Sequence, residues 1–159
     1  MTSEQWHEHI TRRLGVALTL EDFCEAWNRA LDPQTILPDD LFAQLAPRCR
    51  LALLSNTDPI HVEALETCFS FVHHFPVRVY SNQVGASKPS ATIYLAALRA
   101  LGVKPAEALY IDDIAAYADS ARELGLDAIH FEAPQQLYSE LSRRRLPFRT
   151  AGVSGKPIS

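Results

Sequence analysis

Residues 51–59 read Leu-Ala-Leu-Leu-Ser-Asn-Thr-Asp-Pro, a short apolar run followed directly by polar turn residues. The run from Leu51 to Leu54 is apolar at every position, as a strand buried on both faces of a parallel sheet requires. Asp58 and Pro59 then supply a helix N-cap and a proline at the first helical position. The stretch therefore predicts a buried strand that passes through a polar loop into a helix.

The same alternation of strand and helix continues to about residue 131. The stretches 77–80, 108–111 and 128–131, in which most residues are apolar, predict three further strands. A helix is expected to open at Pro89 or Ser90 and to stop at Gly102, and another is expected to stop at Gly125. Such alternation predicts an α/β fold, with a Rossmann-like parallel sheet flanked by helices and ligands at the carboxyl ends of its strands.

The first 45 or so residues have a purely helical pattern. Thr19 followed by Asp22 resembles a capping box, and apolar residues recur behind it at helical spacing. A competing interpretation makes Gly15 to Leu20 a strand that delivers Asp22 to a site, but the stretch is short and the helical pattern follows at once. We expect a helical segment at 1–46, an α/β core at 47–148 and a flexible tail at 149–159.

The composition of the chain limits the kinds of molecule that it is expected to bind. The chain has 159 residues, a net charge of −4 and a pI near 5.8, which gives no general attraction to nucleic acid. No apolar run approaches the length of a membrane span, and the first residues lack a signal-peptide core. The three cysteines form no Cys-x-x-Cys pair, which fits a reducing compartment. We predict a cytoplasmic protein without nucleic-acid or membrane partners.

Three polar segments follow predicted strands: Ser55-Asn56-Thr57, Ser87-Lys88-Pro89 and Asp112-Asp113. Each has an ordinary explanation by itself, as turn chemistry, a surface lysine or a helix cap. Together at one sheet edge, however, hydroxyls, a helix N-terminus and an ammonium hold phosphate, and paired carboxylates hold a divalent cation. The sequence predicts phosphate binding by Ser55, Asn56, Thr57 and Lys88, and binding of a divalent cation by Asp112 and Asp113.

In order and spacing, these segments resemble the motifs of the haloacid dehalogenase (HAD) superfamily of hydrolases. The resemblance covers about residues 50–131, and residues 6–45 resemble the later part of that family's small helical cap. It implies that Ser55 is the hydroxyl of the second motif, Lys88 the lysine of the third, and Asp112 with Asp113 the metal-holding acids of the fourth. The sequence departs from the usual pattern at Ala115-Ala116-Tyr117.

The larger departure is that no Asp-x-Asp occurs in the chain. In the HAD family this motif ends the first strand of the core, and its first aspartate attacks phosphorus. The resemblance therefore implies a truncated relative that starts inside the cap and is a weak or inactive phosphatase. Two alternatives stay open: an active Mg²⁺-dependent phosphomonoester hydrolase that uses Asp58, Asp112 or a partner chain, and a non-enzymatic interaction or regulatory module.

The resemblance also implies that the absent strand is central, between the strands that end at Ser55 and Asp112. Its loss leaves two open strand edges, which favour pairing with another segment. We expect closure by direct contact of those two strands, by a terminal segment, or by exchange within a homodimer.

Overall fold

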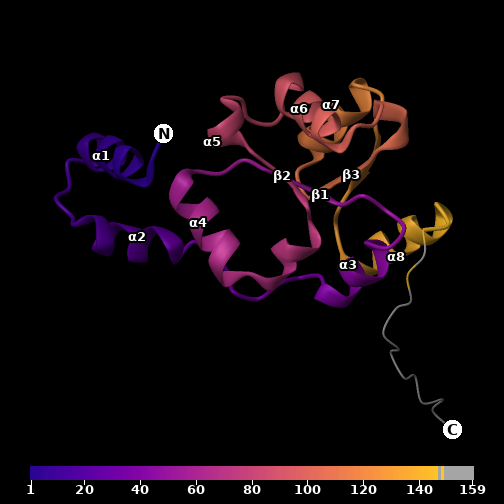
Figure 1. Cartoon of the computed structure of the whole chain (residues 1–159), viewed down its shortest axis with the longest axis horizontal. Helices are drawn as coiled ribbons and strands as arrows, with labels where there is room; N and C mark the ends of the chain where they lie inside the picture. Colours follow the sequence, from indigo (N-terminus) through magenta and orange to yellow (C-terminus); the bar gives the residue numbers. More distant parts are fainter. Residues whose placement is uncertain (147, 149–159) are drawn as a thin grey trace, which may run out of the picture.

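The computed structural model of the chain describes residues 1–146 and 148, so the tail predicted at 149–159 lies outside the described residues. Within them the fold is α/β, with four short parallel strands between layers of helices (Figure 1). The strands form two separate pairs. In one pair β1 (Ala52–Ser55) lies beside β2 (Val77–Tyr80), and in the other β3 (Leu109–Asp112) lies beside β4 (Asp127–His130).

Helices begin and end where the sequence provides caps. The carboxyl end of β1 leads through the Asp58 cap into its helix, and Ser90 and Gly102 bound the helix predicted there. The helices of the core, with two 3₁₀ turns, are α4 (Pro59–Cys68), η1 (Ser70–His74), α5 (Ser81–Val84), α6 (Ala91–Leu101), η2 (Pro105–Glu107), α7 (Ala115–Glu123) and α8 (Pro134–Arg143). All four predicted strands are therefore confirmed to within one residue at each end.

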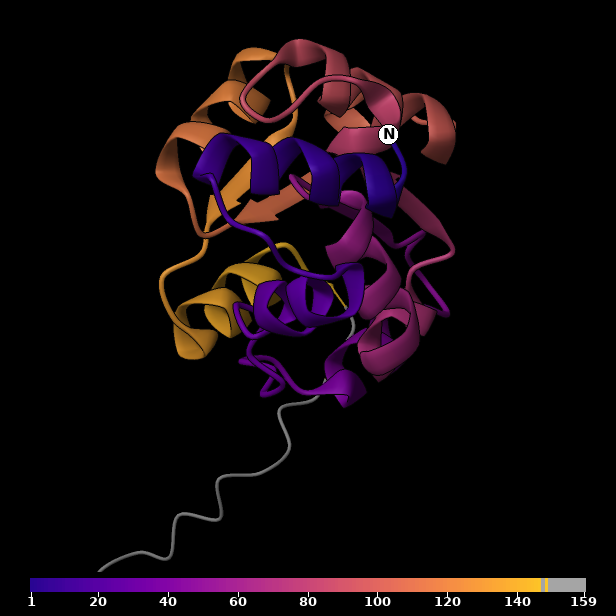
Figure 2. The ribbon, with the colours of Figure 1, turned by 90° about the vertical axis from the view of Figure 1, so that its left-hand side faces the viewer.

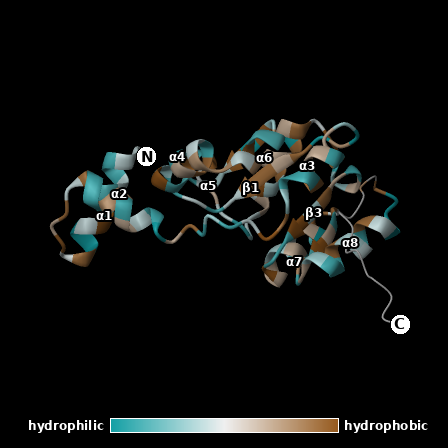
Figure 3. Ribbon diagram, turned by 90° about the horizontal axis from the view of Figure 1, so that it is seen from below, coloured by the Kyte–Doolittle hydropathy of each residue, from teal (hydrophilic) through white to brown (hydrophobic). Residues whose placement is uncertain are grey.

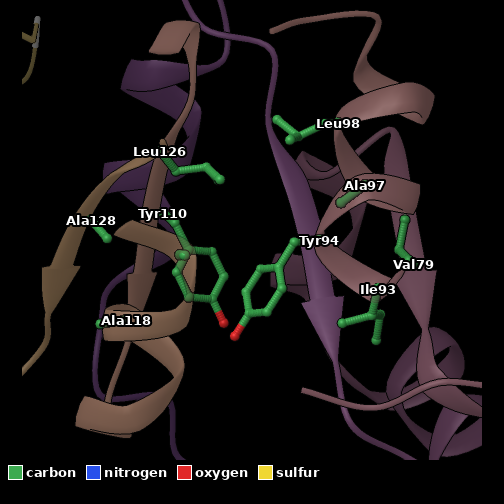
Figure 4. Close-up of a cluster of buried hydrophobic side chains, with 10 residues drawn as sticks. Val79, Ile93, Tyr94, Ala97, Leu98, Tyr110, Ala118, Leu126 and Ala128 are labelled. Atoms are coloured by element: carbon green, nitrogen blue, oxygen red, sulfur yellow. The ribbon is translucent and has the colours of Figure 1, made fainter. Parts of the chain in front are cut away.

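Two hydrophobic clusters join the layers. The first gathers buried side chains of α6 and α7 against β2, β3 and β4, and at its centre the edge of the Tyr94 ring meets Tyr110 (Figure 4). The ring centroids of this pair are 5.3 Å apart. The second cluster packs α3 (Asp39–Leu45) and α8 against Ile129 of β4. Together they cover both faces of the strands, as a parallel sheet requires.

The N-terminal helices α1 (Ser3–Leu14) and α2 (Leu20–Asn28) form a pair at one end of the molecule, and many of their residues are hydrophilic (Figure 3). They pack on α4, and Figure 2 shows α1 in front when this side faces the viewer. Residues 16–19 between them are not a strand, so the helix-cap interpretation of Thr19 is confirmed by its hydrogen bond to the Asp22 amide. Helix α3, which lies before residue 46, packs in the core. The domain boundary predicted at residue 46 stays a prediction.

The two strand pairs do not close into one sheet. No backbone hydrogen bond joins β1 to β3 within the described part of the chain, so of the three expected ways of closing the gap, ladder pairing of these two strands does not occur there. The carbonyls of Ala108 and Asp112 accept from amides on the β4 side, and alternation therefore directs the backbone of Leu109 and Ile111 toward the opposite edge. Ile111 is 39% exposed, which is unusual for an apolar strand residue in a covered sheet.

Among residues 1–146, no helix has the length and apolar character needed to traverse a lipid bilayer.

Candidate functional site

The carboxyl ends of β1 and β3 bring two of the predicted segments into direct contact. The Lys88 ammonium lies 2.7 Å from Asp112 Oδ2 and donates to the Leu54 carbonyl at 3.3 Å. It thus joins the two strand pairs at the edge where the sequence predicts the site. The side chains of Lys88 and Asp112 are only 10% and 6% exposed, so water screens this ion pair weakly.

Asp112 is a buried carboxylate with three hydrogen-bond donors. Its Oδ2 also accepts from the Tyr110 hydroxyl, and its Oδ1 accepts from the Ile114 amide at 2.9 Å. Burial raises the pKa of Asp112, but the hydrogen bonds from Lys88, Tyr110 and Ile114 outweigh it and place the pKa below its ordinary value. Burial, and to a smaller extent the hydrogen bond to Asp112, raise the pKa of the Tyr110 hydroxyl. Asp112 is therefore ionised at neutral pH.

The loop that carries Lys88 is held in place by Asn56. The Asn56 amide accepts from the Lys88 backbone N–H at 2.7 Å and donates to the Lys88 carbonyl at 3.0 Å. It also lies 3.3 Å from the Tyr117 hydroxyl, and the Lys88 ammonium sits 5.1 Å from the centre of the Tyr117 ring. Asn56 thus positions Lys88, and its predicted contact with phosphate stays a prediction.

The start of α4 is less open to an anion than the sequence suggests. Asp58 Oδ1 accepts from the Ile60 and His61 amides, at 2.9 and 3.1 Å, and so occupies first-turn donors. The Thr57 amide donates to Ser81 Oγ at 2.9 Å. His61 Nε2 lies 3.1 Å from the Trp27 carbonyl. These amides already have acceptors within the protein, and phosphate binding at the start of α4 stays a prediction.

Three predicted side chains keep their polar groups free. The hydroxyls of Ser55 and Thr57 and the carboxylate of Asp113 have no hydrogen bond or ion pair to any of the described residues, and Asp113 is exposed. Ser55 ends β1, Thr57 follows it, and Asp113 follows β3 beside the buried Asp112. The available groups are thus two hydroxyls, one ammonium already bound to a carboxylate, and one unpartnered carboxylate.

Two carboxylates at this edge of the sheet are suitable ligands for magnesium. Mg²⁺ favours oxygen ligands and is usually held by one or two carboxylates together with phosphate and water. Asp112 and Asp113 supply carboxylates of this kind, but no cluster of three or more His, Cys, Asp or Glu side chains suited to a metal occurs within the described chain. A metal held by these residues alone therefore has few protein ligands.

Sequence reasoning missed two tyrosines in the site. Tyr110 was expected only as part of an apolar strand, yet its hydroxyl contacts Asp112 two residues later, on the same face of the strand. Tyr117 stands where the resemblance showed a departure from the family pattern, and its ring lies beside Lys88. The i, i+2 spacing of Tyr110 and Asp112 was a usable signal, whereas no local signal indicated Tyr117.

The chain was also compared with known proteins. Residues 7–125 match the family described as haloacid dehalogenase-like hydrolase. A predicted HAD-like family hydrolase from Porphyromonas gingivalis is 26% identical, with a TM-score of 0.77, over 91% of this chain and 74% of that one.

A HAD family enzyme from Bacteroides thetaiotaomicron, solved with magnesium and inorganic phosphate, is 26% identical with a TM-score of 0.73. The match covers 84% of this chain and 71% of that one. An aspartate-to-alanine mutant of the same enzyme, also with magnesium and phosphate, gives 25% identity and a TM-score of 0.72. The family match and the contact between the strand-end segments together show that this chain belongs to the haloacid dehalogenase-like hydrolases.

Proposed function

We propose that this chain binds a phosphate group and Mg²⁺ at the edge formed by β1 and β3, and that by itself it hydrolyses phosphomonoesters slowly or not at all. The observation that carries the proposal is the Lys88–Asp112 pair, flanked by the free Ser55 and Thr57 hydroxyls and the free Asp113 carboxylate. The similar enzyme from Bacteroides thetaiotaomicron was solved with magnesium and phosphate, which supports the choice of ligands.

Each group has a distinct part in binding. The Ser55 and Thr57 hydroxyls donate to phosphate oxygens, and Lys88 neutralises charge on the phosphate while it stays bound to Asp112. Asp113, with Asp112, is the carboxylate pair that would hold Mg²⁺, and the ion would supply charge stabilisation for the bound phosphate. Positioning and charge account for much of the acceleration in phosphoryl transfer, so these groups permit slow attack by water.

Weak turnover follows from the lack of an available nucleophile. Covalent catalysis needs an activated group within bonding reach of phosphorus, and the sequence has no Asp-x-Asp. The candidate replacements are Asp58 and Asp112. Both carboxylates are already committed, Asp58 to the α4 amides and Trp27, and Asp112 to Lys88 and Tyr110. The hydrogen bonds of both residues therefore favour a binding protein or slow hydrolase over a fast one.

Replacement of Asp113 by alanine tests the proposal. Inorganic phosphate and Mg²⁺ together are expected to raise the Tm of the unaltered protein, and Asp113→Ala is expected to remove the Mg²⁺-dependent part, because a free, exposed carboxylate contributes to metal binding and little to folding. Thermal unfolding with and without each ligand measures this. Asp119→Ala, which removes a surface carboxylate of α7, is the control and is expected to keep the full shift.

Turnover of p-nitrophenyl phosphate completes that test. The expected kcat lies far below the roughly 1–10³ s⁻¹ typical of enzymes. Mg²⁺-dependent hydrolysis in the typical range, abolished by Asp113→Ala, would contradict the proposal of weak activity. Absence of any phosphate or Mg²⁺ effect on Tm would contradict the proposal of binding.

The open strand edges favour a second candidate function, a homodimer that pairs strands between copies. The edge that carries the Leu109 and Ile111 backbone has no strand partner in the described chain, and such edges recruit strands from other chains. This candidate covers the interaction-module alternative, because pairing needs no catalysis. A partner chain in such a dimer could also supply the missing acid.

All three cysteines are free thiols. Localisation in the cytoplasm stays a prediction.

Light scattering coupled to size-exclusion chromatography tests the dimer. A mass of twice 17.7 kDa is expected for the unaltered chain, and Ile111→Lys is expected to give a monomer, because a charge on an edge strand opposes pairing. Leu95→Lys alters another exposed apolar residue, on α6, and is the matched control. A monomer at every concentration of the unaltered protein excludes this candidate.

A further inference from the structure

Lys88 supplies the ammonium of the proposed phosphate site, and this ammonium is held on several sides. Its Nζ lies 2.7 Å from Asp112 Oδ2 and 3.3 Å from the Leu54 carbonyl, so two of its three N–H groups have oxygen acceptors. The Nζ also lies over the face of the Tyr117 ring, 5.1 Å from the ring centroid. Groups from β1, β3 and α7 therefore surround the end of the Lys88 side chain.

The core holds the backbone that carries Tyr117. Tyr117 lies in the first turn of α7, and its carbonyl accepts from the Tyr94 hydroxyl at 2.9 Å. Tyr94 is 1% exposed, and its contact with the Tyr110 ring lies within the first hydrophobic cluster. The Tyr117 ring therefore extends toward Lys88 from a part of α7 that a buried side chain of α6 fixes.

The Tyr117 hydroxyl makes a second, weaker link to the same lysine. Asn56 Nδ2 lies 3.3 Å from this hydroxyl and also donates to the Lys88 carbonyl at 3.0 Å. Asn56 is exposed, so water can replace the hydroxyl as the acceptor for the second N–H of the amide. We therefore expect the ring of Tyr117 to influence Lys88 more than its hydroxyl does.

An aromatic ring suits this position for an electrostatic reason. A lysine side chain is a point charge on a flexible stem, so its ammonium needs several contacts to stay in one place. The negative face of the ring attracts a cation, most strongly where water is excluded, and the Lys88 side chain is only 10% exposed. A carboxylate would attract the ammonium too, but it would add to the negative charge of Asp112 and Asp113 and repel phosphate.

We propose that Tyr117 is a positioning residue of this site. The face of its ring holds the Lys88 ammonium between the ends of β1 and β3, so that the cation is in place before a phosphate arrives. Preorganisation of this kind strengthens binding because less freedom is lost when the ligand binds. The inference rests on the proposed function, to which it adds the residue that keeps the cation in position.

Calorimetric binding of inorganic phosphate in the presence of Mg²⁺ tests the effect on affinity. Tyr117→Leu is expected to weaken phosphate binding about tenfold, because the ammonium loses the attraction of the ring. Tyr117→Phe keeps the ring and is expected to stay within about twofold of the unaltered protein. The control is Tyr138→Leu, at a partly buried tyrosine of α8 in the second hydrophobic cluster, and is expected to leave the affinity unchanged.

Brief acetylation with acetic anhydride tests the position of Lys88 without any phosphate. The chain has three lysines, so mass spectrometry can follow each one, and the exposed Lys104 is the internal reference. Relative to Lys104, Lys88 is expected to react about threefold to tenfold faster in Tyr117→Leu, because its amine leaves the ion pair more often. Tyr117→Phe is expected to react at the rate of the unaltered protein.

Fluorination of the ring separates its charge distribution from its shape, and it replaces Tyr117→Leu if that variant does not fold. Phenylalanine, 4-fluorophenylalanine and 3,4,5-trifluorophenylalanine at position 117 have nearly the same shape, but fluorine withdraws electron density from the ring face. Acetylation of Lys88 is expected to rise, and phosphate affinity to fall, in that order. Equal values across the series would overturn the inference.

The remaining outcomes distinguish this inference from the function on which it rests. If phosphate binds equally well to Tyr117→Leu and to the unaltered protein, the positioning role is overturned and the proposed function stands. If Tyr117→Phe is as damaging as Tyr117→Leu, the hydroxyl is responsible and the role of the ring is overturned. If the unaltered protein binds no phosphate with Mg²⁺, the proposed function fails and the positioning role fails with it.

Discussion

Lys88→Met is expected to lower the free energy of unfolding by about 3–5 kcal/mol, the usual cost of leaving one charge of a buried ion pair alone. Asp112 keeps its burial in this variant but loses the ammonium at 2.7 Å, and β1 loses the link from Leu54 to β3. Urea unfolding at neutral pH measures the change. Phosphate binding is expected to disappear as well, because Lys88 is the one ammonium at the proposed site in the described residues.

A control variant and the pH dependence of stability provide two further tests of this prediction. Lys104→Met, at an exposed lysine, is expected to change stability by less than about 0.5 kcal/mol. Because the folded pKa of Asp112 is lowered, the stability from its ion pair is complete above the ordinary Asp pKa of about 3.9 and is lost as pH falls through the lower folded value. Lys88→Met should lose this acid dependence. Neutral-pH stability within 0.5 kcal/mol of the unaltered protein would contradict the account.

Asp58→Ala is the second change with a large expected effect, a loss of about 1.5–5 kcal/mol in the free energy of unfolding. The substitution removes the N-cap of α4, worth roughly 0.5–2 kcal/mol, and leaves the Trp27 N–H without its acceptor, at a cost of about 1–3 kcal/mol. Because Trp27 lies on α2, the variant is also expected to loosen α1 and α2 from α4. Urea unfolding gives the stability, and hydrogen exchange of the α2 amides gives the loosening.

Two matched substitutions separate the contribution of the α4 cap from that of the hydrogen bond to Trp27. Trp27→Phe keeps the cap and an aromatic ring at this position and removes the indole donor itself, so no donor is left unpaired and the variant is expected to account for less than half of the loss. Asp58→Asn keeps one acceptor oxygen for the helix amides but places an NH₂ donor where Oδ2 accepts from the indole N–H, so it is expected to keep the cap, lose the Trp27 hydrogen bond and be milder than alanine. If asparagine proves as damaging as alanine, the cap is not the main source of the stability.

Local patterns predicted the strands and the helix boundaries well. The run from Leu51 to Leu54, the Asp58-Pro59 cap and the stop at Gly102 each depend on a few neighbouring residues, so the sequence alone indicates them. The approach of Lys88 to Asp112 was predicted because parallel strand ends meet at one edge. The family resemblance then gave these residues their expected roles.

Contacts between distant segments could not be predicted in the same way. Asn56 was expected to bind phosphate, but its amide matches the Lys88 backbone 32 residues later. Asp58 was predicted as a cap, yet nothing local shows that its second oxygen holds Trp27, 31 residues earlier. The site therefore depends on tertiary pairings of ordinary polar side chains, for which a single sequence carries no signal.

The division of the strands into two pairs has a consequence for how the protein unfolds. Each pair, with the helix that connects its strands, is a unit closed over a short stretch of chain, and backbone hydrogen bonds do not bridge the units. Side chains among the described residues unite them, including the tyrosine contact, the apolar packing of α6 and α7, the contact of Asn56 with Tyr117, and the Lys88 ammonium. Cooperative unfolding of the two units therefore depends on contacts between side chains. Weakening these contacts should split one unfolding transition into two.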